Sequence, residues 1–153
     1  MKTILLVLIL IPSVAQALQV GAERTSLYLP LLEGKNVALV VNQTSRVNGS
    51  HTIDYLISKK VKVNKLFALE HGIRGDYDAG EDVANGIDVR TGLPVISLYG
   101  NNKKPKKEDL QNVDTIIFDI QDVGVRFYTY ISSLSYILDA CGDFHKTCII
   151  FDR

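Results

Sequence analysis

Short apolar runs alternate with polar segments along most of the chain. The runs are rich in branched side chains and cover residues 37–41, 63–69, 95–98, 115–120 and 147–151. Continuous apolar runs of this length are typical of strands buried on both faces, as in a parallel sheet covered by helices. The pattern therefore predicts that these runs form the strands of one buried sheet.

The polar segment after the first run has helical spacing. Ser50 can cap a helix over 50–60, in which Ile53, Leu56 and Ile57 share one face. This helix would cover the sheet between the first two strands.

Further helices are predicted nearer the C-terminus. Pro105 is expected to open a helix before residue 115, with Leu110 anchoring it. The longest helical pattern covers 128–140, and Gly142 is expected to end it. Strands alternating with helices predict an α/β fold: an open, mostly parallel sheet with helices on both faces.

In such sheets, ligands bind beyond the carboxyl ends of the strands. Five polar residues directly follow apolar runs and should share that edge: Asn42, Glu70, Tyr99, Gln121 and Arg153. We expect the functional site there.

The N-terminus has the pattern of a secretory signal peptide over residues 1–17. Lys2 precedes the apolar run 4–11, and small residues follow the run. Pro12 interrupts the run, which makes a membrane-spanning helix the weaker interpretation. We therefore expect a periplasmic or secreted protein whose mature part, 18–153, forms one domain.

Charge and cysteine content narrow the class further. The chain has 17 Lys plus Arg and 17 Asp plus Glu residues, so it is close to neutral with or without Lys2. This balance favours neither nucleic acid nor stable membrane association as a property of the mature chain. Cys141 and Cys148 could pair in an oxidising compartment or could stay free as apolar fillers, and both alternatives remain open.

The segment 70–81, EHGIRGDYDAGE, is dense in ionisable residues and glycine. Glu70 directly follows an apolar run, where partial burial can raise a carboxyl pKa toward the range of a general acid. The acids after it, Asp76, Asp78 and Glu81, could position sugar hydroxyls or water. Alternatively, these acids only solvate a long loop and Arg74 neutralises one of them.

A metal site in this segment is a weaker alternative. His71 and the nearby acids offer ligands, but their spacing matches neither the calcium loop nor a zinc pattern. We therefore predict no metal and no cofactor.

The segment 118–132, FDIQDVGVRFYTYIS, is the second dense one. Aromatic faces beside carboxylate, amide and guanidinium groups suit carbohydrate, and an arginine can bind a carboxylate with two hydrogen bonds. A sugar with an acidic substituent is thus plausible. The alternative is an ion pair between Asp122 and Arg126, with the tyrosines in the core.

A nucleotide-binding α/β protein is a third possibility, but no G-x-G-x-x-G, Walker loop or G-x-S-x-G elbow is present.

Five segments together resemble the bacterial exo-β-N-acetylmuramidase family, formerly a domain of unknown function. They are VVNQTS (40–45), EHGIRGDYDAGE (70–81), RTGLPVISLYG (90–100), FDIQDVGVRFYTYIS (118–132) and FDR (151–153), in family order. The resemblance implies the Rossmann-like N-terminal domain of an enzyme that releases N-acetylmuramic acid from the non-reducing ends of peptidoglycan fragments. Leu69 and Ile73 stand where the family usually has proline and phenylalanine.

On this basis we predict that Glu70 is the general acid, tuned by His71. The predicted substrate-binding residues are Asn42, Arg74, Asp76, Glu81, Asp119, Gln121, Asp122, Arg126 and Tyr128. The partner would be a peptidoglycan-derived glycan or muropeptide. Because the family continues into a C-terminal domain, we expect a truncated form, and a noncatalytic glycan-binding or vestigial module is the alternative. Stereochemistry and oligomeric state are left open.

Overall fold

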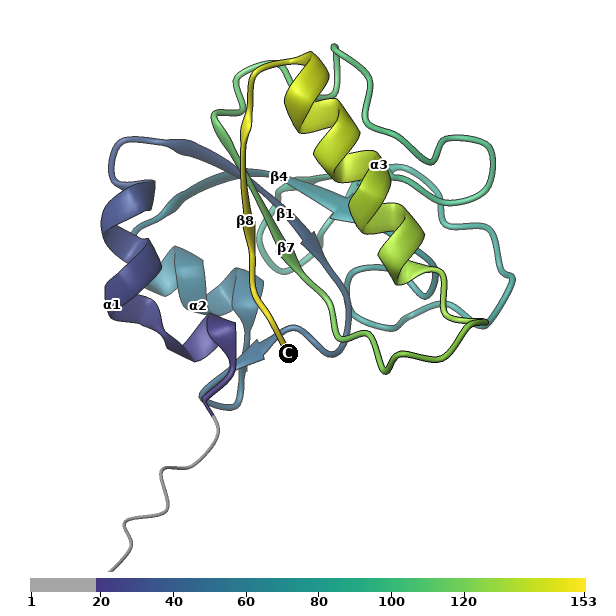
Figure 1. Cartoon of the computed structure of the whole chain (residues 1–153), viewed down its shortest axis with the longest axis horizontal. Helices are drawn as coiled ribbons and strands as arrows, with labels where there is room; N and C mark the ends of the chain where they lie inside the picture. The colour runs from purple at the N-terminus through teal and green to yellow at the C-terminus, as the bar shows by residue number, and fades with distance from the viewer. Residues whose placement is uncertain (1–18) are drawn as a thin grey trace, which may run out of the picture.

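The structure, a computed structural model, describes residues 19–153 and is built on one six-stranded sheet with the order β5-β6-β4-β1-β7-β8 (Figure 1). The parallel strands are β1 (Asn36–Val41), β4 (Lys62–Ala68), β6 (Pro94–Ser97), β7 (Thr115–Asp119) and β8 (Thr147–Ile150). A short strand, β5 (Gly86–Ile87), pairs antiparallel with β6. The five apolar runs thus form the five parallel strands, as predicted.

Helices cover both faces of this sheet. The 14-residue helix α3 (Tyr130–Asp143) lies on one face. On the other face lie α2 (Thr52–Ser58) and the N-terminal turns, which are η1 (Gly21–Glu23), α1 (Thr25–Tyr28) and η2 (Leu29–Leu32). The predicted open α/β sheet is confirmed.

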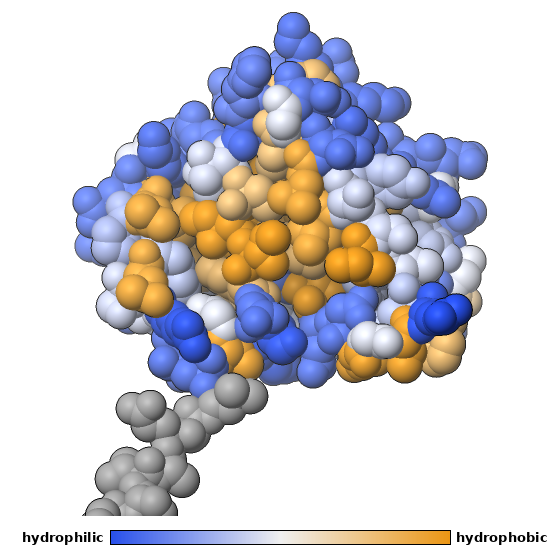
Figure 2. All heavy atoms as spheres, in the orientation of Figure 1, coloured by the Kyte–Doolittle hydropathy of each residue, from blue (hydrophilic) through white to orange (hydrophobic). Residues whose placement is uncertain are grey.

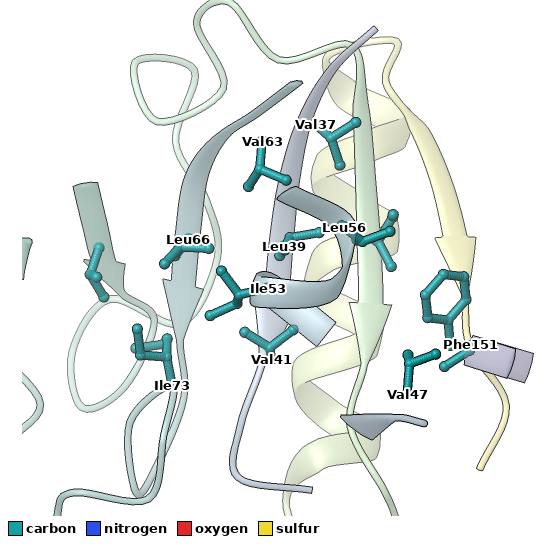
Figure 3. Close-up of a cluster of buried hydrophobic side chains, with 14 of the residues drawn as sticks. Val37, Leu39, Val41, Val47, Ile53, Leu56, Val63, Leu66, Ile73 and Phe151 are labelled. Carbon is teal, nitrogen blue, oxygen red and sulfur yellow. The ribbon is translucent and has the colours of Figure 1, made fainter. Parts of the chain in front are cut away.

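The central strand β1 divides the apolar core into two layers. Val37, Leu39 and Val41 point to the α2 side, whereas Ala38 and Val40 point to the α3 side. Figure 3 shows α2 lying across β1 and β4 with its apolar side chains against the first set. Because side chains alternate along a strand, the unbroken apolar run 37–41 of β1 supplies both layers.

The segment after Pro105 forms successive turns instead of the expected helix. The amide of Asp109 donates to the carbonyl of Lys106 at 3.0 Å, and the Asp109 carboxylate accepts from the Lys106 amide at 2.8 Å. Asn112 then takes a left-handed conformation with φ 56°. The backbone bonds of this segment therefore join residues three apart, and the left-handed Asn112 ends the turns before a helix is built, although Leu110 is buried as expected.

The start of α2 and the end of α3 also differ from the predicted positions. His51, and not Ser50, caps α2, because its Nδ1 accepts from the amide of Ile53 at 3.2 Å. Ser50 lies in β3 (Ser50–His51), which pairs with β2 (Arg46–Val47). At the other end, α3 continues through Gly142, and the left-handed position falls at His145 with φ 52°.

The outermost strand, β8, leaves apolar surface exposed. Ile150 is 47% exposed, and Figure 2 shows apolar side chains gathered in the middle of the face that carries this strand. Cys148 on β8 and the buried Cys141 on α3 are free thiols, so the structure contains no disulfide between them. No helix within 19–153 is long and apolar enough to cross a membrane. The predicted signal peptide lies outside the described residues.

Candidate active site

A pocket of about 270 Å³ lies beyond the carboxyl ends of β1, β4 and β7. Its polar side is formed by Asn42, Gln43, Thr44, Glu70, His71 and Gln121. Its other side is formed by Val123, Phe127, Tyr128, Thr129 and Tyr130. Residues that are far apart in the sequence, including Glu70, Gln121 and Tyr128, therefore meet in one cavity.

Glu70 follows β4 directly, and its carboxylate is held by one oxygen. Oε1 accepts a hydrogen bond from the Tyr99 hydroxyl at 3.1 Å and another from the amide of Gly80 at 3.2 Å. The hydrogen bond to Glu70 raises the pKa of Tyr99, so the phenol stays protonated and acts as the donor. Oε2 has no hydrogen-bond partner among residues 19–153. The carboxyl group is thus anchored at one oxygen, and the other can exchange a proton with a ligand.

His71 and Gly72 form a sharp turn after Glu70. Both have left-handed backbones, with φ 69° and 74°, which is an unusual conformation for a histidine. Nδ1 of His71 lies 3.1 Å from the carbonyl of Tyr77. A carbonyl only accepts, so Nδ1 carries the hydrogen and Nε2 remains an acceptor when the ring is neutral. This turn reverses the direction of the chain and places His71 beside Glu70 in the pocket lining.

Asn42 is completely buried at the end of β1 and has one unused donor. Its Oδ1 accepts from the amide of Thr44 at 2.9 Å and from the Thr44 hydroxyl at 2.6 Å, which fixes the orientation of the amide group. Nδ2 consequently faces away from Thr44 and has no partner among the described residues. Burial raises the pKa of Tyr130, and an interaction with the Asn42 side chain partly lowers it, so Nδ2 lies toward the Tyr130 hydroxyl but does not meet it in hydrogen-bond geometry. A buried unpaired donor on a pocket wall suits an acceptor oxygen of a ligand.

Thr44 also connects the two sides of the pocket. Its hydroxyl accepts a hydrogen bond from the amide of Gln121 at 3.1 Å, which joins the loop after β1 to the loop after β7. Beyond Gln121, Tyr128 packs edge-on against Phe127 and Tyr130, with ring centroids 5.7 and 5.9 Å apart. Phe127 is 81% exposed, which leaves an aromatic face open to a ligand.

Asp119 lies beneath the pocket and does not line it. Its side chain is fully buried, forms an ion pair with Arg153, and accepts from the Thr52 hydroxyl at 2.5 Å. The predicted contact of Asp119 with a ligand does not fit this position. Its observed contacts instead hold α2 and the C-terminal Arg153 against the end of β7.

Arg74 is also committed to partners within the protein. Its guanidinium donates to both oxygens of Asp88, at 3.0 and 2.9 Å, and to both oxygens of Asp54, at 3.3 Å. The hydrogen bonds from Arg74 lower the pKa of Asp88 to about 2. The expectation that Arg74 binds a sugar carboxylate, or neutralises an acid of its own loop, therefore needs correction. Arg74 ties its loop to α2 and to the segment after β5.

The other predicted binding residues lie outside the pocket. Asp76 borders a separate groove, and Glu81 accepts from the amide of Asp78 at 2.8 Å. Asp122 accepts from the amide of Gly124 at 2.7 Å, and its other oxygen is buried without a partner. Arg126 is exposed and forms no ion pair with Asp122 in the described structure. The carboxylates of Glu81 and Asp122 thus hold turns in the loops around the cavity.

The predicted site residues did not include several residues of the pocket wall: Gln43, Thr44, Val123, Phe127, Thr129 and Tyr130. Each is adjacent to a predicted residue or one position removed from one, so contiguity within a loop was the available signal. Across 19–153, no three His, Cys, Asp or Glu side chains are grouped in a way that could hold a metal ion.

Comparison with known proteins connects this site to a family. Residues 37–153 match the family described as exo-beta-N-acetylmuramidase NamZ, N-terminal. The chain belongs to this family. It is 45% identical over 129 residues to the peptidoglycan beta-N-acetylmuramidase NamZ of Bacillus subtilis (strain 168).

Solved structures agree with this assignment. Two crystal structures of DUF1343 family proteins from Bacteroides fragilis NCTC 9343 are 38% and 39% identical, with TM-scores of 0.74 and 0.78. The alignments cover 88% of this chain and 34% of each of those chains. The match to the Bacillus subtilis protein covers 82% of this chain and 31% of that protein. The chain thus spans about a third of the length of these relatives.

Proposed function

We propose that this NamZ-family chain contributes the acid-bearing wall of a glycosidase that releases N-acetylmuramic acid from the non-reducing ends of peptidoglycan fragments. One observation carries the proposal: Glu70, the unpaired Asn42 amide and an aromatic wall line the same cavity. The Bacillus subtilis relative, a peptidoglycan beta-N-acetylmuramidase by name, supports the substrate class.

The pocket has the groups that an N-acetylated sugar needs. Aromatic rings such as Tyr128 can pack against the apolar face of a pyranose. Nδ2 of Asn42 can donate to the acetamido carbonyl or to the lactyl carboxylate of the sugar, and either contact would satisfy its unpaired donor. Gln121 adds a second amide at the rim.

Glu70 would act as the general acid. In that step the protonated carboxyl gives its proton to the glycosidic oxygen while the bond from this oxygen to the anomeric carbon breaks, and the anomeric carbon gains an oxygen that comes from water in the net reaction. Tyr99 and Gly80 hold Oε1, so Oε2 is the oxygen available for the transfer. His71 supports the same wall through its hydrogen bond to Tyr77.

Glycoside hydrolysis commonly needs two carboxyl groups, but Glu70 is the only carboxylate among the residues that line this pocket. We propose that the second group comes from the part of the relatives' length that this chain does not span. The single carboxylate also favours the second candidate function, a glycan-binding module without turnover. Export of the chain, proposed from the sequence of residues 1–17, would bring it to its substrate.

The test combines binding with turnover. The purified chain is titrated with N-acetylmuramic acid by NMR and then assayed with a chromogenic muramic glycoside. We expect binding with shifts at the pocket residues, and Glu70→Gln should retain binding but abolish any turnover. Glu108→Gln, an exposed carboxylate away from the pocket, should change neither.

Binding without turnover by the wild-type chain favours the glycan-binding module. Absence of binding at the pocket contradicts both functions.

A further inference from the structure

We propose that His51 is a positioning residue whose buried imidazole joins the two pocket loops that carry Asn42 and Glu70. His51 itself does not line the pocket of the active site. It lies at the start of α2, behind the pocket wall, and is 7% exposed.

The imidazole of His51 contacts three segments of the chain. Its Nε2 lies 3.0 Å from the carbonyl of Asn42 and 3.0 Å from the carbonyl of Ile73. Its Nδ1 accepts from the amide of Ile53 at 3.2 Å. The ring therefore joins the end of β1, the loop after Glu70 and the first turn of α2.

These partners select one protonation state. The Ile53 amide can only donate, so Nδ1 must be unprotonated. Both carbonyls can only accept, so Nε2 must carry the hydrogen and share it between them. The neutral Nε2–H tautomer fits all three contacts, whereas the Nδ1–H tautomer would lose all of them.

The contacts on Nε2 have a direct consequence for the pocket. Asn42 presents its unpaired amide to the cavity, and its carbonyl is one end of the bridge. Ile73 follows Glu70 and His71 across the left-handed turn, and its carbonyl is the other end. The hydrogen that the two carbonyls share thus fixes the spacing between the loop that carries Asn42 and the loop that carries Glu70.

A simpler role for His51 would be that of a helix cap only. Two substitutions separate the roles. His51→Asn keeps an acceptor near the Ile53 amide but is too short to bridge the carbonyls, whereas His51→Gln keeps a donor at the reach of Nε2 and loses the cap acceptor. If positioning matters, the Asn variant should disturb the pocket more than the Gln variant.

Three measurements on the purified chain test this inference. Long-range ¹⁵N NMR should find the Nε2–H tautomer of His51 at neutral pH. Hydrogen exchange of the 70–81 amides should accelerate in His51→Asn and stay closer to wild type in His51→Gln. Binding of N-acetylmuramic acid should weaken about tenfold in His51→Asn, in keeping with the loss of a buried hydrogen bond, and should be largely retained in His51→Gln.

The binding measurement rests on the proposed function, whereas the tautomer and exchange measurements do not. An Nδ1–H tautomer would overturn the inference. Equal damage by both substitutions, including loss of folding, would also overturn it, because His51 would then be a general core residue. If the sugar fails to bind the wild-type chain while the tautomer and exchange results hold, the proposed function fails and the positioning role stands.

Discussion

The carboxylate of Glu70 and the hydroxyl of Tyr99 lie 3.1 Å apart, directly after the neighbouring parallel strands β4 and β6. This bond orients the proposed general acid from the side away from β1. A parallel sheet is well suited to such an arrangement, because its strand ends project side chains from distant positions onto one edge.

Replacing Tyr99 by phenylalanine should loosen the Glu70 carboxyl with little loss of packing. We expect only a small fall in the free energy of unfolding, because water can replace the lost hydrogen-bond partner of the Glu70 carboxylate at this accessible site. Exchange of the Gly80 amide, which shares Oε1, should become faster. Urea denaturation and hydrogen exchange measure these effects, and Tyr136→Phe is the matched control, because Tyr136 has no described side-chain hydrogen bond. An unchanged Gly80 amide would contradict the coupling.

Removing the guanidinium of Arg74 should lower the free energy of unfolding far more than the replacement of Tyr99. Asp88 would remain as a carboxylate with 5% side-chain exposure and without its charged partner, so we expect a loss of about 3 kcal/mol. Arg90→Ala is the control, because Arg90 is 67% exposed and contacts only Asp54 at 3.4 Å. It should cost less than about 1 kcal/mol. Equal midpoints of denaturation for the two variants would show that the ion pairs of Arg74 with Asp54 and Asp88 do not stabilise the fold.

Gly72→Ala should destabilise the turn through two separable effects. An added Cβ would lie 2.7 Å from the Tyr77 ring, and the backbone has φ 74°. Gly80 has a similar φ of 77° but open space around the Cβ position, so Gly80→Ala measures the backbone cost alone, about 1 kcal/mol. Thermal denaturation should show a larger loss for Gly72→Ala, part of which Tyr77→Ala should recover. Equal losses would mean that the contact with Tyr77 has no effect.

Stability should decrease as the pH falls below the ordinary histidine range. Burial, followed by the nearby positive charge of Arg74, lowers the pKa of His51, and Asp54 and two backbone carbonyls only partly oppose this. Between the unfolded value of about 6.5 and the lower folded value, the unfolded chain binds a proton that the folded chain does not. The free energy of unfolding therefore falls with decreasing pH in that window. Urea denaturation at pH 7.5 and at pH 5.5 tests this, and His51→Gln should show a smaller drop.

The parallel strands and the position of the site were predictable because both follow from local patterns. Each strand is a continuous apolar run, and a polar residue after each run must reach the carboxyl edge. Glu70, Gln121 and Asn42 could therefore be placed together from the sequence.

The pairing of charged residues could not be predicted in the same way. Arg74 binds Asp54 and Asp88, which lie outside its own loop, and Asp119 at the end of β7 binds Arg153, which follows the neighbouring strand β8. The partners of these ion pairs depend on which side chains the tertiary fold brings together, and the spacing of charged residues in the sequence carries no information about that. The cap of α2 was missed because α2 begins at Thr52, so His51 and not Ser50 occupies the position directly before the helix.

The hydrogen bond from Gln121 to Thr44 joins parts of the chain separated by 77 positions. During synthesis, a ribosome must therefore complete β7 and the loop after it before the loop after β1 finds this partner. A nascent chain that stalls before β7 would expose an incomplete sheet and could not hold a ligand. The timing of translation thus sets the earliest moment at which this protein can bind anything in its pocket.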